Sequence, residues 1–192
     1  MKWGNSVFTE KRVKGKGVLF AATRIASLQK IAGHDGILGN GCYGVVAKHP
    51  NVPNAVIKVG YGYAHGADYD GYSEFIRRAN TDARFKGNPH LPRCAHLERF
   101  LFDDDTCVFV AVLESLNKYD FQAHHKQVRP LFRKVESKYD NLWSLREART
   151  ADAEKAFSLI ATLHDEGFSN DLHTGNVMLR GDHTIVITDP VT

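Results

Sequence analysis

The run Asp171-Leu-His-Thr-Gly-Asn176, followed by the single aspartate Asp189, is the stretch of this 192-residue chain that decides its fold. Asn176 comes five positions after Asp171, and Asp189 comes thirteen positions after Asn176. That interval gives room for two short strands and a turn, and the apolar runs 177–179 and 184–188 predict such a hairpin. Carboxylate and amide oxygens are ligands that Mg²⁺ prefers. The run therefore predicts a loop and hairpin at which Asn176 and Asp189 bind a metal ion.

A glycine-rich turn lies earlier in the chain, with the sequence Gly39-Asn40-Gly41-Cys-Tyr-Gly44-Val-Val46. It matches the pattern G-x-G-x-x-G-x-V at every fixed position and lies between two segments that favour β-strands. Glycines let backbone N–H groups approach phosphates closely, so the turn is a candidate phosphate-binding loop. The alternative is an ordinary β-hairpin with a glycine turn, because the motif alone is weak evidence.

A lysine follows the glycine turn at the end of the short apolar run Ala55-Val-Ile-Lys58. Lys58 comes fourteen residues after Gly44, and on a strand it would direct its ammonium group at the α and β phosphates of a nucleotide. The expected partner of this lysine is Glu74, the acid that lies well inside the helix predicted over 70–78. An exposed strand lysine and a solvated helix glutamate are the alternatives.

Segments rich in β-favouring residues predict strands over 37–46, 55–59, 96–102 and 107–113. The first segment counts as two strands because the glycine turn divides it, and the acidic turn 103–106 joins the last two. We expect these strands to form a five-stranded antiparallel sheet.

Helical spacing of apolar residues predicts helices over 19–31 and 70–78. A further helix is expected to begin after Thr150, which can cap it, and to end at Gly167. Residues 117–149 carry many charges and are expected to form surface helices without defined limits.

The composition is that of a globular protein, with 43% apolar and 24% charged residues. No run approaches the roughly 20 apolar residues that a membrane helix needs. The first residues do not form a secretory signal, so we expect no membrane association and a cytoplasmic location. The three cysteines have no metal-binding spacing and are expected to be buried thiols; they are Cys42, Cys94 and Cys107.

The first thirty residues are basic, with seven Lys or Arg side chains against the single acid Glu10. Such a segment can bind acidic protein or nucleic acid. A solvated surface is the commoner role of a charged segment, and we expect no direct binding of nucleic acid.

The order of these features resembles the nucleotide site of protein-kinase-like folds. In those folds a glycine loop and a strand lysine precede a catalytic aspartate, and a metal-binding asparagine and aspartate follow it. The resemblance implies an α+β, bilobal fold with an N-lobe at 37–115 and a reduced, mainly helical C-lobe at 116–192. Residues 1–36 would be a basic N-terminal extension packed on the N-lobe.

The resemblance also implies a role for each site residue, with ATP and Mg²⁺ as cofactors. Asp171 and Lys58 would be catalytic, because Asp171 would accept or orient the proton of the substrate hydroxyl. Val46 would cover one face of the adenine and Met178 would form the apolar floor beneath it. Glu114 and Leu116 would bind the nucleotide from the hinge; the glycine-turn residues Gly39, Asn40, Gly41 and Gly44 would cover its phosphates.

Two kinase families compete for the resemblance. The loop Asp171-Leu-His-Thr-Gly-Asn176 resembles that of aminoglycoside and choline kinases, and Asp189-Pro-Val191 stands where a protein kinase usually has Asp-Phe-Gly. A closer likeness is to the early serine/threonine protein kinases of T-odd podophages, and it covers roughly residues 37–191. It is carried by segments 38–41, 49–50, 53–54, 56–60, 173–178 and 187–191. That likeness implies a phage enzyme that phosphorylates host bacterial proteins in the host cytoplasm. Some of its members carry a further C-terminal region linked to shutoff of host transcription.

Two other functions remain open. A kinase-derived protein could inhibit a host factor by binding alone, and a small-molecule kinase could use the same loop. In this sequence three residues follow Asp189, which fits either a truncated chain or a minimal natural form. For a minimal form we expect protein substrates to be held elsewhere, by residues 117–149 or by the basic N-terminal segment.

Overall fold

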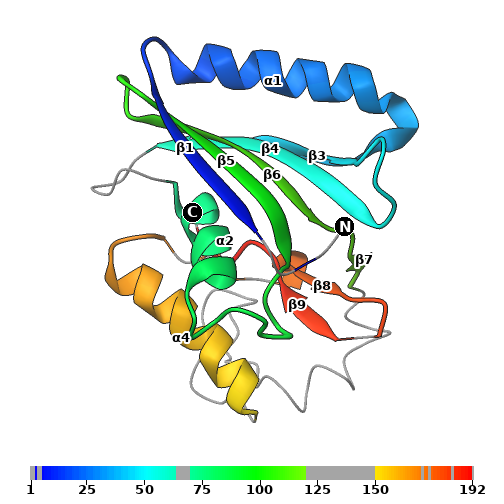
Figure 1. The fold of residues 1–192 in the computed structure, drawn as a ribbon, viewed down its shortest axis with the longest axis vertical. Helices are drawn as coiled ribbons and strands as arrows, with labels where there is room; N and C mark the ends of the chain where they lie inside the picture. Colours follow the sequence, from blue (N-terminus) through cyan, green and yellow to red (C-terminus); the bar gives the residue numbers. More distant parts are fainter. Residues whose placement is uncertain are drawn as a thin grey trace. The chain divides into compact units, whose positions relative to one another are not determined.

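The computed structural model describes most of the chain and divides it into two compact units (Figure 1). The first unit comprises Met1–Arg77 and Arg93–Ser115, and the second comprises Arg78–Pro92 and Leu116–Thr192. The described residues are 3, 6–63, 70–119, 150–169, 171–172, 174–182 and 184–191. The surface helices expected over 117–149 fall almost wholly outside the described residues.

A mixed six-stranded sheet forms the first unit, with the strand order β1-β5-β6-β4-β3-β2. The strands are β1 (Val7–Val13), β2 (Ile37–Gly41), β3 (Gly44–Lys48), β4 (Ala55–Tyr63), β5 (Cys94–Phe102) and β6 (Thr106–Glu114). Strands β2 to β6 pair with one another in antiparallel fashion, as expected. The prediction of a five-stranded, wholly antiparallel sheet is wrong, because β1 joins the edge of the sheet parallel to β5.

Strand β1 is held at the edge by polar contacts as well as by its backbone. The register places Glu10 opposite Arg99, and their side chains form an ion pair of 2.9 Å. Lys11 forms a second ion pair with Glu98 of β5. At the start of the strand the Ser6 hydroxyl donates to the carbonyl of Cys94. These contacts explain how a segment with four successive polar residues, 9–12, becomes a strand.

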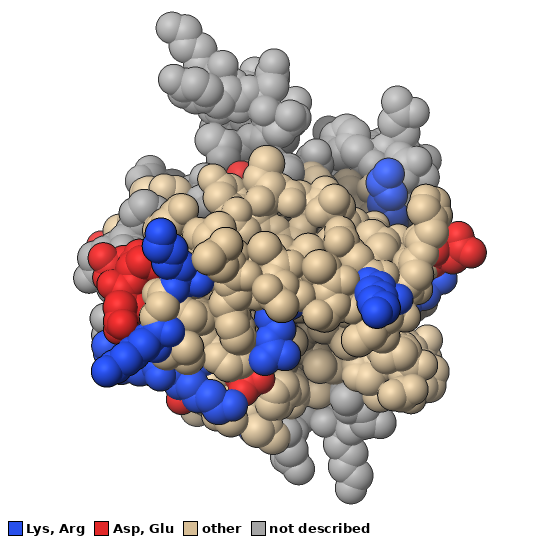
Figure 2. Space-filling model, turned by 90° about the horizontal axis from the view of Figure 1, so that it is seen from above, with Lys and Arg blue, Asp and Glu red and all other residues tan. Residues whose placement is uncertain are grey.

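Helix α1 (Gly17–Ala32) covers one face of this sheet and confirms the helix predicted over 19–31. Ala21 is fully buried in a cluster with Phe100, Phe102 and Val108. The first residue of the helix, Gly17, has to be glycine because a Cβ there would lie 2.4 Å from Cβ of Thr106. Seen from the α1 side (Figure 2), basic side chains are scattered over a mostly uncharged surface.

Helix α2 (Gly71–Thr81) lies on the opposite face of the sheet from α1 (Figure 1) and confirms the helix predicted over 70–78. Asp70 begins it as an N-cap, since its Oδ1 accepts a hydrogen bond of 2.9 Å from the N–H of Ser73. Phe75 and Ile76 are fully buried. The helix therefore has a fixed start and a fixed rotation, which determine where its polar side chains point.

The second unit contains a three-stranded sheet and a long helix. The sheet has the order β7 (Asn117–Lys118), β8 (Val177–Leu179) and β9 (Ile185–Ile187), and the hairpin predicted between the last two is confirmed. Helix α4 (Ala151–Asp165) begins after Thr150, whose Oγ1 accepts from the N–H of Ala153 as predicted. A 3-10 helix, η3 (Thr174–Asn176), leads into β8. No described helix is long and apolar enough to cross a membrane.

The segment after α2 is bound to the β8–β9 hairpin. Arg180 donates to the carbonyls of Pro89 and Leu91 at 2.7 and 3.2 Å, and the N–H of Ile187 donates to the carbonyl of His90 at 3.0 Å. His90 Nδ1 lies 2.9 Å from the carbonyl oxygen of Ile185. These contacts explain why residues 78–92 belong to the second unit.

The thiols differ in accessibility, which gives a first testable prediction. Cys42 is exposed in the glycine turn, contrary to the expected burial, whereas Cys94 and Cys107 are buried. Burial raises the pKa of the Cys94 thiol to about 12 and also raises the pKa of Cys107. Ellman's reagent at pH 8 should therefore modify one thiol rapidly in the folded protein and none rapidly in Cys42→Ser. Any fast-reacting thiol in the folded Cys42→Ser variant would contradict the structure.

Candidate functional site

The glycine turn connects β2 to β3, with Gly41 paired to Gly44 and Gly39 paired to Val46. A Cβ at Gly44 would lie 2.5 Å from the carbonyl oxygen of Val59, so the neighbouring strand β4 requires glycine there. A Cβ at Gly39 or Gly41 would meet no described atom within 4 Å, and neither residue has a positive φ. Close packing against β4 explains why residue 44 is glycine. At Gly39 and Gly41 no described atom lies within 4 Å of where a Cβ would be, so a ligand could approach the backbone closely.

Lys58 lies on β4, two residues before Gly60, and its strand neighbour is Val46 of the glycine hairpin. Its Nζ lies 3.3 Å from the centre of the Tyr72 ring and 6.0 Å from the centre of the Phe109 ring. The two rings are 5.0 Å apart at an interplanar angle of 31°. The ammonium group of Lys58 is thus held against an aromatic pair from α2 and β6.

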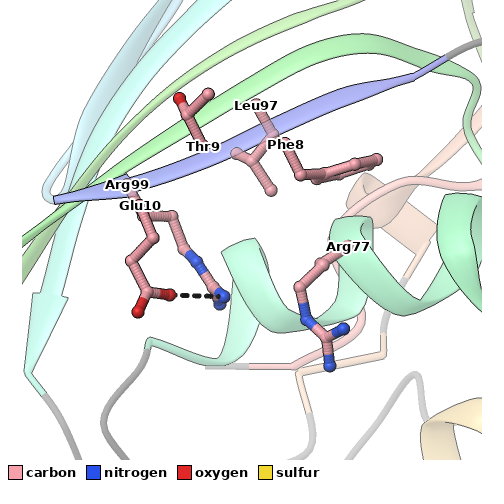
Figure 3. A pocket seen from close by; sticks show the side chains of 6 residues that line it. All are labelled: Phe8, Thr9, Glu10, Arg77, Leu97 and Arg99. Carbon is pink, nitrogen blue, oxygen red and sulfur yellow. Dashed lines mark hydrogen bonds and ion pairs between the residues drawn. The ribbon is translucent and has the colours of Figure 1, made fainter.

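The carboxylate of Glu74 is buried and is bound by two guanidinium groups of the first unit. Arg77 donates to it through Nε at 2.9 Å and Nη2 at 2.6 Å, and Arg99 donates through Nη1 at 3.0 Å. Arg99 also binds Glu10 beside a pocket of about 80 Å³ that Phe8 and Arg77 line (Figure 3). A chain of ion pairs, Arg77–Glu74–Arg99–Glu10, therefore connects α2 to β5 and β1. The predicted pairing of Glu74 with Lys58 remains a prediction.

The residues predicted to contact the nucleotide base lie on different elements. Val46 is half-buried on β3, and Met178 is half-buried on β8 of the second unit. Glu114 ends β6, and its Oε1 accepts a hydrogen bond of 2.9 Å from the N–H of Arg93. Leu116 begins the stretch of the second unit that follows Ser115. Their roles toward a nucleotide remain predictions.

The loop of the second unit brings Asp171 and Asn176 together. Nδ2 of Asn176 donates to the carbonyl oxygen of Asp171 at 2.8 Å and to its Oδ2 at 3.1 Å. The backbone carbonyl of Asn176 accepts hydrogen bonds from both the N–H and the hydroxyl of Thr188, at 2.8 and 3.0 Å. The N–H of Asp171 donates to the carbonyl of Pro190 at 2.8 Å. Hydrogen bonds on both sides of Asp189 therefore fasten its segment to the loop.

The amide of Asn176 has a defined orientation because both partners of its nitrogen are acceptors. Its oxygen is therefore the end of the side chain that can bind a metal ion, and the carboxylate of Asp189 remains the second predicted oxygen ligand. No group of three His, Cys, Asp or Glu side chains lies together as a metal site in the described part of the chain. An amide, a carboxylate and phosphate oxygens form the donor set that the sequence predicts.

Three residues that contribute to these arrangements were missed by sequence reasoning: Tyr72, Arg99 and Thr188. Tyr72 comes two positions before Glu74, but helix spacing alone does not show that its ring contacts Lys58. Arg99 is 25 residues from Glu74 in the sequence, so only the fold brings them together. Thr188 could have been singled out, because it directly precedes Asp189 and can donate a side-chain hydrogen bond.

A glycine hairpin followed by a strand lysine, and an Asp–Asn loop fastened to a strand that ends near an aspartate, are typical of a protein kinase. A comparison with protein families agrees with this class. The model of the family described as bacteriophage T7 protein kinase 0.7 matches residues 6–192, nearly the whole chain. The chain belongs to this family of phage protein kinases. No curated protein matches the sequence significantly.

The contrast between two glycines of the turn can be tested by substitution. Gly44→Ala should lower the free energy of unfolding by about 1–3 kcal/mol, because the new methyl group would overlap the backbone of β4. Gly39→Ala, the matched control, should change it by less than about 0.5 kcal/mol. Urea unfolding followed by circular dichroism measures both values. Equal stabilities of the two variants would contradict the packing described for Gly44.

Proposed function

We propose that the protein is an ATP-dependent serine/threonine protein kinase that uses Mg²⁺ and phosphorylates host bacterial proteins early in phage infection. The family match supports a phage protein kinase. The observation that carries the proposal is the Asp171–Asn176 pair, whose hydrogen bonds orient a carboxylate and an amide oxygen in one loop. The family match supports the class of enzyme, and we add the proposal that the nucleotide is ATP, the metal is Mg²⁺ and the acceptors are Ser and Thr.

In this proposal the glycine turn and Lys58 bind the phosphates of ATP. The open backbone at Gly39 and Gly41 supports this role, because neither crowding nor backbone conformation in the described chain requires glycine at these positions. Lys58 supplies a positive charge that offsets the charge of the α and β phosphates. Asn40, Val46, Glu114, Leu116 and Met178 keep their predicted roles around the nucleotide.

Mg²⁺ fits the donor set that Asn176 and Asp189 offer. Both would supply oxygen atoms, which suit a hard cation that completes its coordination with phosphate oxygens and water. The bound Mg²⁺ would neutralise charge on the phosphates of ATP during transfer. Thr188 and Pro190 hold the backbone around Asp189 to the loop, so the two metal ligands keep their relative position.

Asp171 would act on the substrate hydroxyl. Its carboxylate would accept or orient the hydroxyl proton while the hydroxyl oxygen attacks the γ-phosphorus of ATP and the bond to the β-phosphate oxygen breaks. The hydrogen bond from Asn176 to Oδ2 fixes the rotation of this carboxylate. The products would be a phosphorylated Ser or Thr side chain and ADP.

We further propose that the enzyme acts in the host cytoplasm and that its substrates are host proteins, some of them connected with transcription. The resemblance described above supports this part of the proposal. The Asp-Leu-His sequence of the loop favours one other function, phosphate transfer to a small molecule. The same assay separates the two functions.

The decisive assay incubates the full chain with γ-labelled ATP and a bacterial lysate. Wild-type protein should transfer label to Ser and Thr of lysate proteins, and phosphoamino-acid analysis identifies the acceptors. Asp171→Ala should lose transfer by a factor of at least about 100 while it still binds ATP, because it removes proton transfer and leaves the phosphate-binding groups.

Asp182→Ala is the matched control for this assay. Asp182 is an exposed aspartate at the turn of the β8–β9 hairpin and should keep wild-type transfer. Full transfer by Asp171→Ala would overturn the kinase assignment. Label found only in small metabolites would favour the small-molecule kinase, and host effects that persist in Asp171→Ala would favour an inhibitory binding protein.

A further inference from the structure

One row of residues crosses the sheet from its outer edge to the glycine hairpin. Neighbouring strands pair Glu10 with Arg99, Arg99 with Phe109, Phe109 with Gly60, and Gly60 with Gly44. A Cβ at Gly60 would lie 2.5 Å from Cζ of Phe109, so the ring occupies the space that a side chain at Gly60 would need. This row links the edge strand β1 to the strand that follows the glycine turn.

Helix α2 packs on this row through two residues. Tyr72 places its ring 5.0 Å from the ring of Phe109, and Glu74 accepts a hydrogen bond of 3.0 Å from Arg99. Tyr72 is 7% exposed and the Glu74 side chain is 3% exposed. Because the two contacts lie half a turn apart on one helix, the Glu74–Arg99 bond limits rotation of α2 and thereby fixes the place of the Tyr72 ring.

The Tyr72 ring in turn contacts Lys58. Its centre lies 3.3 Å from Nζ of Lys58, well within the distance of about 6 Å at which a cation is attracted to an aromatic face. The attraction is strongest where water is excluded, and both Tyr72 and Phe109 are buried. An ammonium group has three N–H donors, and a ring on one side still leaves it able to donate to phosphate oxygens on another.

We propose that Tyr72 is a positioning residue for Lys58: the face of its ring holds the ammonium group where the phosphates of ATP bind. The proposal deepens the function proposed above, since it rests on Lys58 as the phosphate-binding lysine. Glu74, which two guanidinium groups bind, contributes by fixing helix α2. The aromatic ring is the part of Tyr72 that acts, and its hydroxyl group is not required.

Kinetics of three variants test the role of the ring. Tyr72→Leu removes the ring but keeps an apolar side chain, and it should raise KM for ATP about 3- to 30-fold with kcat within about twofold of wild type. Tyr72→Phe keeps the ring, so its KM for ATP should stay within about twofold of the wild-type value. Phe102→Leu removes a buried ring on the α1 side of the sheet and should leave KM unchanged. Unchanged KM in folded Tyr72→Leu, or a raised KM in Tyr72→Phe, would overturn the proposal.

Nuclear magnetic resonance tests the same contact without any phosphate transfer. In protein with ¹³C-labelled lysine, the ε-methylene signal of Lys58 should lie upfield of the other lysines, because the ring current of Tyr72 shields it. Lys58→Arg assigns the signal, Tyr72→Phe should keep the shift, and Tyr72→Leu should remove it. An unshifted Lys58 signal in wild type would overturn the positioning role, even if Tyr72→Leu fails to fold. An upfield signal in a protein that transfers no phosphate would instead overturn the proposed function and leave the ring contact standing.

Discussion

The predicted chemistry of the second unit depends on the hydrogen bonds that the side-chain amide of Asn176 makes with Asp171. The side-chain nitrogen of Asn176 donates to both the backbone carbonyl and the carboxylate of Asp171, whereas the backbone carbonyl of Asn176 accepts two hydrogen bonds from Thr188. Because an amide has distinct donor and acceptor ends, the two bonds of its nitrogen also determine the direction of its oxygen. One side chain therefore orients the predicted catalytic carboxylate and carries the oxygen predicted to bind a metal ion. It lies in a loop that hydrogen bonds fasten to the segment of Asp189.

In the first unit one helix, α2, organises the surroundings of the predicted phosphate-binding lysine. Helix α2 begins at a fixed cap, buries Phe75 and Ile76, and presents Tyr72 to Lys58 and Glu74 to Arg99. Burying a charged side chain is costly unless oppositely charged groups form hydrogen bonds with it. The bonds of Glu74 to two arginines meet this requirement and extend the influence of α2 to the edge strand β1. Within the N-terminal segment, β1 thus joins the sheet, while α1 packs on one of its faces.

Local patterns allowed the hairpin at 177–187, helix α4 and strands β2 to β6 to be predicted, because each carries its own apolar periodicity or capping residue. Strand β1 could not be predicted, because residues 9–12 are polar and its place depends on partners about ninety residues away in the sequence. The pairing of Asp171 with Asn176 follows from their short separation. The surroundings of Lys58 and Glu74 did not follow, because they depend on Tyr72, Phe109 and Arg99, which three different elements bring together.

The most direct test of the central claim is whether ATP binding depends on Mg²⁺ through Asn176 and Asp189. Isothermal titration of the full chain with ATP should show binding that weakens at least about tenfold when Mg²⁺ is removed with a chelator. In Asp189→Asn or Asn176→Ala, we expect weak ATP binding that Mg²⁺ no longer strengthens. Folded variants that bind ATP as tightly as wild type and still respond to Mg²⁺ would show that other residues hold the metal.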